Sequence, residues 1–297
     1  MTLDDRQCWF NVAVTDGLGP ASAQKILKYL DRRELPASAL ADMEAEQLQF
    51  AIGLKAGVAV KLQIQLRSPV AAPDAPEGVE LLVPCDDRFP IDRFRDANPP
   101  LPPLLWASAD TALLRHGGPA LAVAGARDTT DSVLDLVHDI GRTASRRDWL
   151  IVSGLAQGVD SAAHTGALAG PTGTIGVLAC GIANTSRSWM PDDTEAMCIV
   201  SQFGLHEPWS GPRAMQRNSV IAGLADRVLV AAAGTSGGSW EMAQLCLKRR
   251  KTLFVLDLEP EVAPGNRALI RAGAIPVDPL DLERLFAELD EPTTLFD

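Results

Sequence analysis

Four short glycine-containing segments have the residue types and spacing that could hold a phosphate. They are Gly125-Ala126-Arg127, residues 153–160, Cys180-Gly181 and residues 234–239. Each follows a short apolar run and leads towards a segment that we expect to be helical. Glycine lets a phosphate approach the backbone, and the free amides and dipole of a helix N-terminus attract an anion. One such turn is common in any strand-to-helix connection, but four together favour a phosphate-binding edge.

The candidate phosphate ligands come from these turns and from a basic segment further along the chain. Arg127 could bind a phosphate through two N–H groups of its guanidinium, or it could pair with Asp128 on the surface. Arg217-Asn218 is expected to begin a helix just before an apolar run, and residues 248–251 are four consecutive cations at a predicted helix end. The helix dipole accounts for only one or two of those four. The full candidate set is Gly125, Arg127, Ser153, Gly154, Gly181, Arg217, Asn218, Gly237, Gly238, Ser239, Lys248, Arg249 and Arg250.

Catalytic and metal-binding patterns are weak. The chain has no GxxxxGK[ST] or GxGxxG sequence, and its four histidines lack metal-ligand spacing. Asp160 and His164 would share a helix face as an acid–base pair, but a capping aspartate beside a packed histidine is the more usual arrangement. Glu241 remains a candidate catalytic carboxylate, because it is expected one turn into a helix beside the anion site. Its other role is a favourable interaction with the helix dipole. We therefore assign no catalytic residue, no metal and no cofactor.

The elements that position these residues follow a strand–turn–helix pattern. Apolar runs at 120–124, 149–152, 174–178, 198–201, 227–231 and 252–256 predict strands. Helical periodicity at 131–145, 160–169, 218–224 and 239–251 predicts helices between them. Near-continuous apolar strands indicate a parallel sheet covered on both faces, with ligands at the carboxyl ends of the strands. The predicted fold class is α/β, an extended Rossmann-like, doubly wound, mostly parallel sheet with a small N-terminal all-helical domain.

The N-terminal segment, 1–68, has helical spacing and a Gly17-Leu18-Gly19-Pro20 turn. Such a turn is typical of a helix-hairpin-helix or SAM-like domain, where it contacts a nucleic-acid backbone or simply packs tightly. The proline-rich segment 69–78 predicts a linker. We expect the Rossmann-like domain at 79–280 and an acidic C-terminal tail at 281–297.

The overall charge argues at first against a nucleic-acid-binding protein. The chain has 27 basic and 38 acidic residues, a formal net charge of −11. Residues 210–251, however, carry seven basic and two acidic groups, whereas residues 252–297 carry three and ten. This distribution predicts a narrow positive path whose affinity for nucleic acid falls early as salt rises. The five scattered cysteines form no CxxC pair, and no signal peptide or membrane-length apolar run is present, so we expect a reduced, cytoplasmic protein that does not bind membranes.

Six motifs in order along the chain resemble those of the DNA-processing protein A (DprA/Smf) family. Gly17–Pro20 is similar to the glycine turn of its helical domain, and Phe89-Pro90 with residues 100–106 is similar to its entry to the sheet. Gly125-Ala126-Arg127 resembles the family's Gly-Ser-Arg. The other three matches are residues 153–164, the segment Arg217-Asn218-x-x-Ile221-Ala222-Gly223-Leu224, and residues 265–274.

The resemblance implies sequence-independent binding and protection of single-stranded DNA by a Rossmann-like domain. It also implies a homodimer that loads a RecA-type recombinase during natural transformation, with Arg127, Arg217 and Asn218 in the DNA pocket and no enzymatic activity. Several positions depart from the family pattern, among them Ala126, Ala183, Ser219 and Glu241, and Trp189-Met190-Pro191 stands where the family has Tyr-Pro. The acidic tail is also too short for the winged-helix domain of many members, so we expect none. These departures predict weaker DNA binding.

Two other hypotheses remain open. One is a SLOG-like module that senses or processes a nucleotide, in which Gly237-Gly238 and Glu241 would act together. The other is a scaffold that retains the fold but binds only a protein partner.

Overall fold

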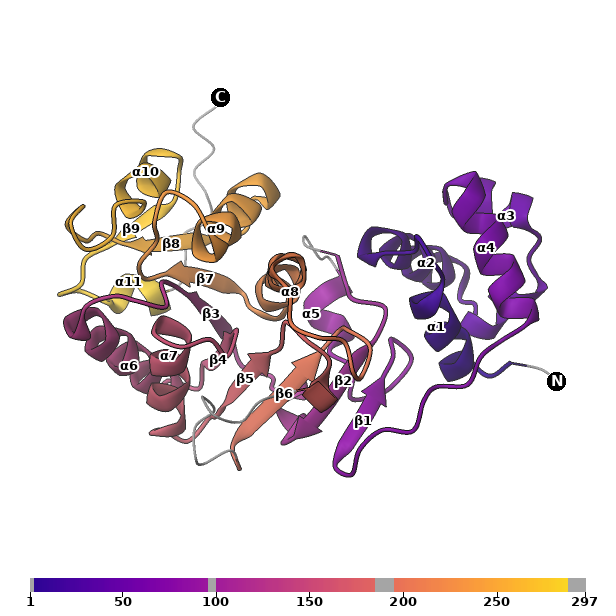
Figure 1. Ribbon diagram of the computed structural model, residues 1–297, viewed down its shortest axis with the longest axis horizontal. Coiled ribbons are helices and arrows are strands. Elements are labelled where there is room, and N and C mark those ends of the chain that lie inside the picture. Colours follow the sequence, from indigo (N-terminus) through magenta and orange to yellow (C-terminus); the bar gives the residue numbers. More distant parts are fainter. Residues whose placement is uncertain (1–2, 96–99, 185–194, 288–297) are drawn as a thin grey trace.

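The computed structural model describes residues 3–95, 100–184 and 195–287 (Figure 1). The chain begins with helices α1 (Asp5–Val14), α2 (Pro20–Arg33), α3 (Ala45–Phe50) and α4 (Ala56–Arg67), together with a 3-10 turn, η1 (Ala37–Asp42). Pro20 opens α2, as the sequence predicted, because its fixed φ suits the first helical position. Gly17 precedes it at a φ of +82°, which L side chains rarely adopt, so the glycine turn is required by its geometry. Residues 69–76 form no helix or strand.

The described residues after 78 form the helices and strands of an α/β domain. Its nine-stranded sheet has the strand order β1-β2-β6-β5-β4-β3-β7-β8-β9. Its strands are β1 (Val79–Leu82), β2 (Leu105–Ala109), β3 (Ala120–Ala124), β4 (Leu150–Ser153), β5 (Thr174–Val177), β6 (Met197–Ser201), β7 (Arg227–Val230), β8 (Leu253–Leu256) and β9 (Ile275–Val277). The pairings of β1 with β2 and of β2 with β6 are antiparallel, and all the others are parallel. The predicted mostly parallel, doubly wound α/β sheet is therefore confirmed.

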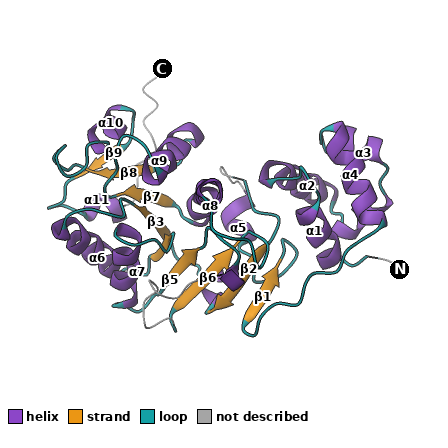
Figure 2. Cartoon of the chain, viewed as in Figure 1, coloured by secondary structure: helices purple, strands orange, loops and turns teal. Residues whose placement is uncertain are grey.

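Helices cover both faces of this sheet (Figure 2). Helices α6 (Asp131–Arg146) and α7 (Val159–Leu168) pack on one face, where Leu121 and Val123 belong to the same core cluster. Helices α8 (Gly211–Leu224), α9 (Gly238–Arg249) and α10 (Asn266–Arg271) contribute to the other cluster, which continues into the N-terminal helices. Alternation along each buried strand, with Ala120 and Ala122 facing one layer and Leu121 and Val123 the other, explains why the strands are apolar throughout.

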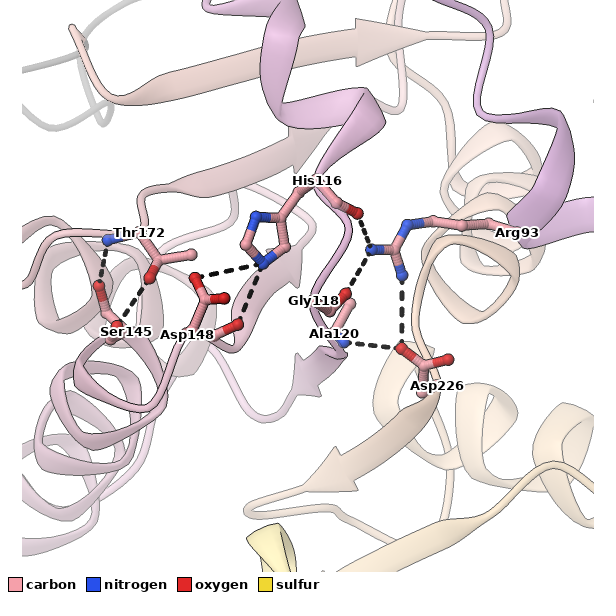
Figure 3. A network of polar contacts seen from close by, with 8 residues as sticks. All are labelled: Arg93, His116, Gly118, Ala120, Ser145, Asp148, Thr172 and Asp226. Atoms are coloured by element: carbon pink, nitrogen blue, oxygen red, sulfur yellow. Dashed lines mark hydrogen bonds and ion pairs between the residues drawn. The ribbon is translucent and has the colours of Figure 1, made fainter.

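A polar network ties together the amino ends of the strands (Figure 3). Arg93, on helix α5 (Ile91–Arg95), donates from Nη2 to the carbonyl oxygens of His116 and Gly118, both at 2.9 Å. The Asp226 carboxylate accepts from the Ala120 amide at 2.7 Å and lies 3.4 Å from Arg93 Nη1. These bonds join the starts of β3 and β7.

The structure differs from the sequence prediction at three elements. Helix α8 begins at Gly211 rather than at 218, because Ser210 caps it and Pro212 suits its first turn. Strand β9 was not predicted; it is an edge strand, where its proline is tolerated. Cys180-Gly181 leads only into a short 3-10 turn, η3 (Ile182–Asn184), so it provides no α-helical N-terminus.

The segment predicted as an acidic tail begins as a docked helix, α11 (Glu283–Phe286). Glu283 accepts two hydrogen bonds from Arg147, and the Phe286 ring meets Trp149 edge-on with centroids 5.6 Å apart. Residues 288–297 lie outside the described residues, as does the Trp189-Met190-Pro191 segment. No helix within the described ranges is long and apolar enough to cross a membrane.

Candidate nucleic-acid interface

The candidate site lies where the strand order reverses. The chain runs from β3 through β4 and β5 on one side, whereas β7 pairs with β3 on the other side. The turns that follow β3 and β7 therefore diverge at the carboxyl edge, which is the usual ligand position in an open α/β sheet. A cavity of about 370 Å³ opens there between the two turns and helix α8. Its lining includes Gly125, Arg127, Arg217, Asn218 and Ser239.

Arg217 forms the floor of this cavity. The prediction that Arg217-Asn218 begins a helix was wrong, because α8 starts six residues earlier and Arg217 lies nearly two turns inside it. The residue is only 9% exposed. A Cβ added to Gly154 would lie 1.3 Å from Arg217 Nη1, so the absence of a side chain at position 154 makes room for the guanidinium. Glycine is needed in this turn to admit the arginine, in addition to any approach by a phosphate.

The charge of Arg217 is only partly balanced by the protein. Its Nη1 atom lies 4.0 Å from Oδ2 of Asp160, which is also buried and accepts a 3.3 Å hydrogen bond from the Ala156 amide. Arg217 Nε is buried and has no hydrogen-bond partner among the described residues. Burial raises the pKa of Asp160 and lowers the pKa of Arg217, because each charged form loses its water. An anion entering the cavity could supply the missing acceptor.

Arg127 and Trp209 form the rim above Arg217. The Arg127 Cζ atom lies 5.8 Å from the centroid of the Trp209 ring, within cation–π range. A second cavity, of about 310 Å³, adjoins the first. The two cavities share four lining residues: Arg127, Ala156, Trp209 and Arg217. Two arginines against one buried aspartate make this edge locally cationic in an acidic protein.

The turn before α9 supplies the polar side of the first cavity. Gly237 has a φ of +93°, and Gly238 and Ser239 line the cavity at the helix N-terminus. Asn218 Nδ2 donates to the Gly238 carbonyl oxygen at 3.3 Å, so α8 holds this turn in place. Glu241 is exposed and is not one of the residues lining either cavity. The helix-terminal groups therefore lie on the same cavity as the two arginines.

Other predicted site residues have different positions. Ser153 is buried, and its Oγ donates to the Val123 carbonyl oxygen at 2.6 Å, so its hydroxyl links β4 to β3. Gly181 donates its amide to the Glu207 carbonyl oxygen and packs against the Gly204-Leu205 backbone. Lys248, Arg249 and Arg250 lie at the opposite end of α9, about 15 Å from its N-terminus at 1.5 Å per residue. The structure does not bring these three cations to the cavity.

His164 is a packed residue rather than half of an exposed acid–base pair. Thr174 Oγ1 donates to the Ile151 carbonyl oxygen at 2.9 Å, so His164 Nδ1 donates to that hydroxyl at 2.8 Å. Burial, together with the nearby charge of Arg217, lowers the pKa of His164 to about 3. The imidazole is therefore neutral at physiological pH. Within the described residues, no cluster of side chains could hold a metal ion.

Sequence reasoning missed two residues at the mouth of the cavity, Trp209 and Met215. Their signal was weak, because neither belongs to a glycine turn or a charged run. A usable signal was the position of Trp209 directly before Ser210, which caps the helix that carries Arg217.

Comparison with known proteins supports one family. The model of the family described as DNA recombination-mediator protein A matches residues 80–289. The DNA processing protein DprA of Bacillus subtilis is 29% identical over 198 residues, which cover 64% of this chain and 65% of the relative. The protein Smf of Synechocystis is 28% identical over 203 residues, which cover 66% of this chain and 50% of that relative. The chain thus matches about two thirds and one half, respectively, of the lengths of these relatives.

Solved structures agree with this result. The X-ray structure of DNA processing protein A from Streptococcus pneumoniae matches with a TM-score of 0.71 and 22% identity, covering 98% of this chain and all of that chain. A structure of DNA processing protein A from Helicobacter pylori, described for its single-stranded DNA binding mode, matches with a TM-score of 0.56 and 25% identity. It covers 70% of this chain and 93% of that chain. The chain belongs to the DNA recombination-mediator protein A family.

Proposed function

We propose that this protein binds single-stranded DNA without sequence preference and that Arg217 and Arg127 contact its phosphates. The observation that carries the proposal is the Arg217 guanidinium, which is buried at the floor of a cavity and has a free Nε donor among the described residues. Within the part of the chain that the structure describes, this guanidinium has one ion pair, at 4.0 Å, so it retains donors for a phosphate.

The depth of Arg217 favours a single strand over a duplex. Its side chain is 10% exposed, so a phosphate must enter the cavity to reach it. A single strand can turn one phosphate inward, whereas the regular backbone of a duplex resists such a local bend. Contacts to phosphates carry no direct sequence information, which fits binding without sequence preference.

The experiment is fluorescence anisotropy of a labelled oligo-dT across a range of salt concentrations. Wild-type affinity should fall with salt, with a slope of about 0.7 logarithmic units per phosphate contact. Arg127→Ala should weaken binding and reduce the slope by about that amount. Arg217→Ala should do the same, with thermal melting to establish that the variant is folded.

Arg267→Ala is the matched control. Arg267 is exposed and pairs with Glu259 at 2.9 Å, and neither residue lines the cavities at the carboxyl edge. Absence of oligo-dT binding by the wild type at low salt would refute the proposed function. Unchanged binding in both cavity variants would refute the assignment of the two arginines.

We further propose that the DNA-bound protein is a homodimer that protects the strand and loads a RecA-type recombinase. The support is membership of the recombination-mediator family. Light scattering measures the dimer, and nuclease resistance of bound oligo-dT measures protection. Strand exchange by the recombinase on DNA coated with single-stranded-DNA-binding protein measures loading. We expect Arg217→Ala to lose the stimulation of strand exchange. Full stimulation by that variant would show that recombinase loading does not depend on this cavity.

A mononucleotide is the competing ligand, because the Gly238-Ser239 helix start on the cavity could hold a terminal phosphate. Glu241, the carboxylate that a nucleotide-processing reaction would need, is exposed and does not line the cavity. Thermal-shift measurements with nucleoside monophosphates test this alternative. A large stabilisation that is lost in Glu241→Ala would favour it over DNA binding.

A further inference from the structure

An exposed tryptophan stands beside the two arginines. Trp209 is 56% exposed, and Met215, on the first turns of α8, is 37% exposed. Both line the mouth of the first cavity. An apolar rim above a cationic floor suits a ligand that is aromatic at one end and anionic at the other, which describes a nucleotide unit.

Trp209 also stands between the two cavities, since it lines both. The first cavity includes the polar start of α9, whereas the second is lined by apolar side chains of Leu155, Leu178 and Ala179. A strand passing over the rim from one cavity to the other would therefore cross the indole ring.

The backbone around Trp209 is held before any ligand arrives. Arg213 Nη1 donates to the Pro208 carbonyl oxygen at 2.9 Å, and its Nη2 also pairs with the Glu207 carboxylate. Ser210 accepts from the Arg213 amide at 3.3 Å. Arg127 lies over the ring at 5.8 Å. Because the loop is fixed on both sides of Trp209, stacking on its indole costs little ordering entropy.

We propose that Trp209 is the platform on which one base of the bound strand stacks, while the adjoining phosphate contacts Arg127 and Arg217. This inference rests on the proposed function and adds a base contact to it. Every base has a π face, so the platform increases affinity without reading sequence.

The test compares Trp209→Leu and Trp209→Phe on two labelled strands of equal length, oligo-dT and an abasic strand with the same phosphates. Trp209→Leu should weaken oligo-dT binding by about 5- to 150-fold, the range of one base–aromatic stack. Trp209→Phe should retain most of the affinity. Wild type should bind the abasic strand more weakly than oligo-dT, and Trp209→Leu should weaken that binding little further.

The salt slope should stay the same in Trp209→Leu, because no phosphate contact is removed. Phe50→Leu is the matched control, since Phe50 is 78% exposed on α3 and lines neither cavity. This control should bind both strands like the wild type.

Three results would overturn the platform. Equal losses on oligo-dT and on the abasic strand would mean that Trp209 only orients Arg127. Unchanged oligo-dT binding in Trp209→Leu, alongside weakened binding in Arg217→Ala, would refute the platform and leave the proposed function intact. Failure of the wild type to bind either strand would refute the proposed function, and the platform with it.

Discussion

Asp160→Asn tests how the protein controls the charge of Arg217. The two charged atoms are 4.0 Å apart, which corresponds to about 4 kcal/mol of attraction at an effective dielectric constant near 20. Part of this attraction is offset already, because burial raises the pKa of Asp160 by disfavouring its charged form. We therefore expect Asp160→Asn to lower the free energy of unfolding by about 2–3 kcal/mol. The asparagine can still accept the hydrogen bond from the Ala156 amide.

The same substitution should strengthen DNA binding. Without the carboxylate, Arg217 has no counter-charge at the cavity floor, so a DNA phosphate becomes its partner. A gain of about 1–2 kcal/mol would raise the affinity for oligo-dT about 5- to 30-fold. Bound DNA should also raise the melting temperature of the variant more than that of the wild type, because the phosphate restores the missing negative charge.

Urea unfolding at pH 7 measures the stability, and anisotropy with oligo-dT measures the affinity. Glu259→Gln is the matched control, because it makes the same carboxylate-to-amide change in the exposed pair with Arg267 and should cost no more than about 1 kcal/mol. If Asp160→Asn is folded but binds DNA more weakly than the wild type, then Asp160 positions Arg217 and does not compete with phosphate. That result would refute the reasoning.

Three other perturbations have definite expected outcomes. The pKa of His164 is lowered to about 3 in the folded protein, so the unfolded chain binds the extra proton between about pH 3 and its ordinary 6.5. Stability should therefore rise with pH across this window by up to about 1.4 kcal/mol per unit, and urea unfolding of His164→Gln should show a flatter profile. Asn266→Ala should lower the free energy of unfolding by about 2–4 kcal/mol, because the buried Asn266 side chain accepts from the Ala233 amide and donates to the carbonyl oxygens of Ala231 and Leu256. Wild-type stability of that variant in urea unfolding would contradict the stabilising role of these three hydrogen bonds. The double variant Lys248→Gln with Arg250→Gln should change oligo-dT affinity by less than about two-fold, because both residues lie at the far end of α9. A larger loss of affinity, measured by anisotropy, would show that the bound strand extends beyond the cavity.

The fold was predictable wherever a local pattern had one structural solution. The amphipathic spacing at 131–145 predicted α6 to within one residue, since its apolar side chains fit a single face. Glycine turns after apolar runs also predicted where the strands at the carboxyl edge end, because each strand with an apolar run stops at its turn. Helix α8 was less predictable, because the residues before 218 are mixed in polarity and only the Ser210 cap marks its start.

The site was only partly predictable, because several residue types fit more than one place. Arg127, Arg217, Gly238 and Ser239 line one cavity, whereas Gly237, which was predicted with them, is not among its lining residues. Lys248 to Arg250 were assigned by charge alone, although the predicted helix at 239–251 already placed them at its carboxyl end, away from its N-terminal turn. Ser153 was assigned as a ligand because its turn contains glycine, yet its hydroxyl is used inside the sheet.

The sequence by itself determined the parallel α/β architecture, the glycine turns and the family to which the chain belongs, because these depend on periodicity and short motifs. Only the tertiary structure decided that Arg217 lies buried beside Asp160, and that Trp209 stands next to Arg127. Those contacts join residues that are 57 and 82 positions apart in the chain, and the fold brings them to one cavity at the carboxyl edge of the sheet. Net charge is a sum over the chain, whereas binding depends on the few charges that the fold places around one cavity.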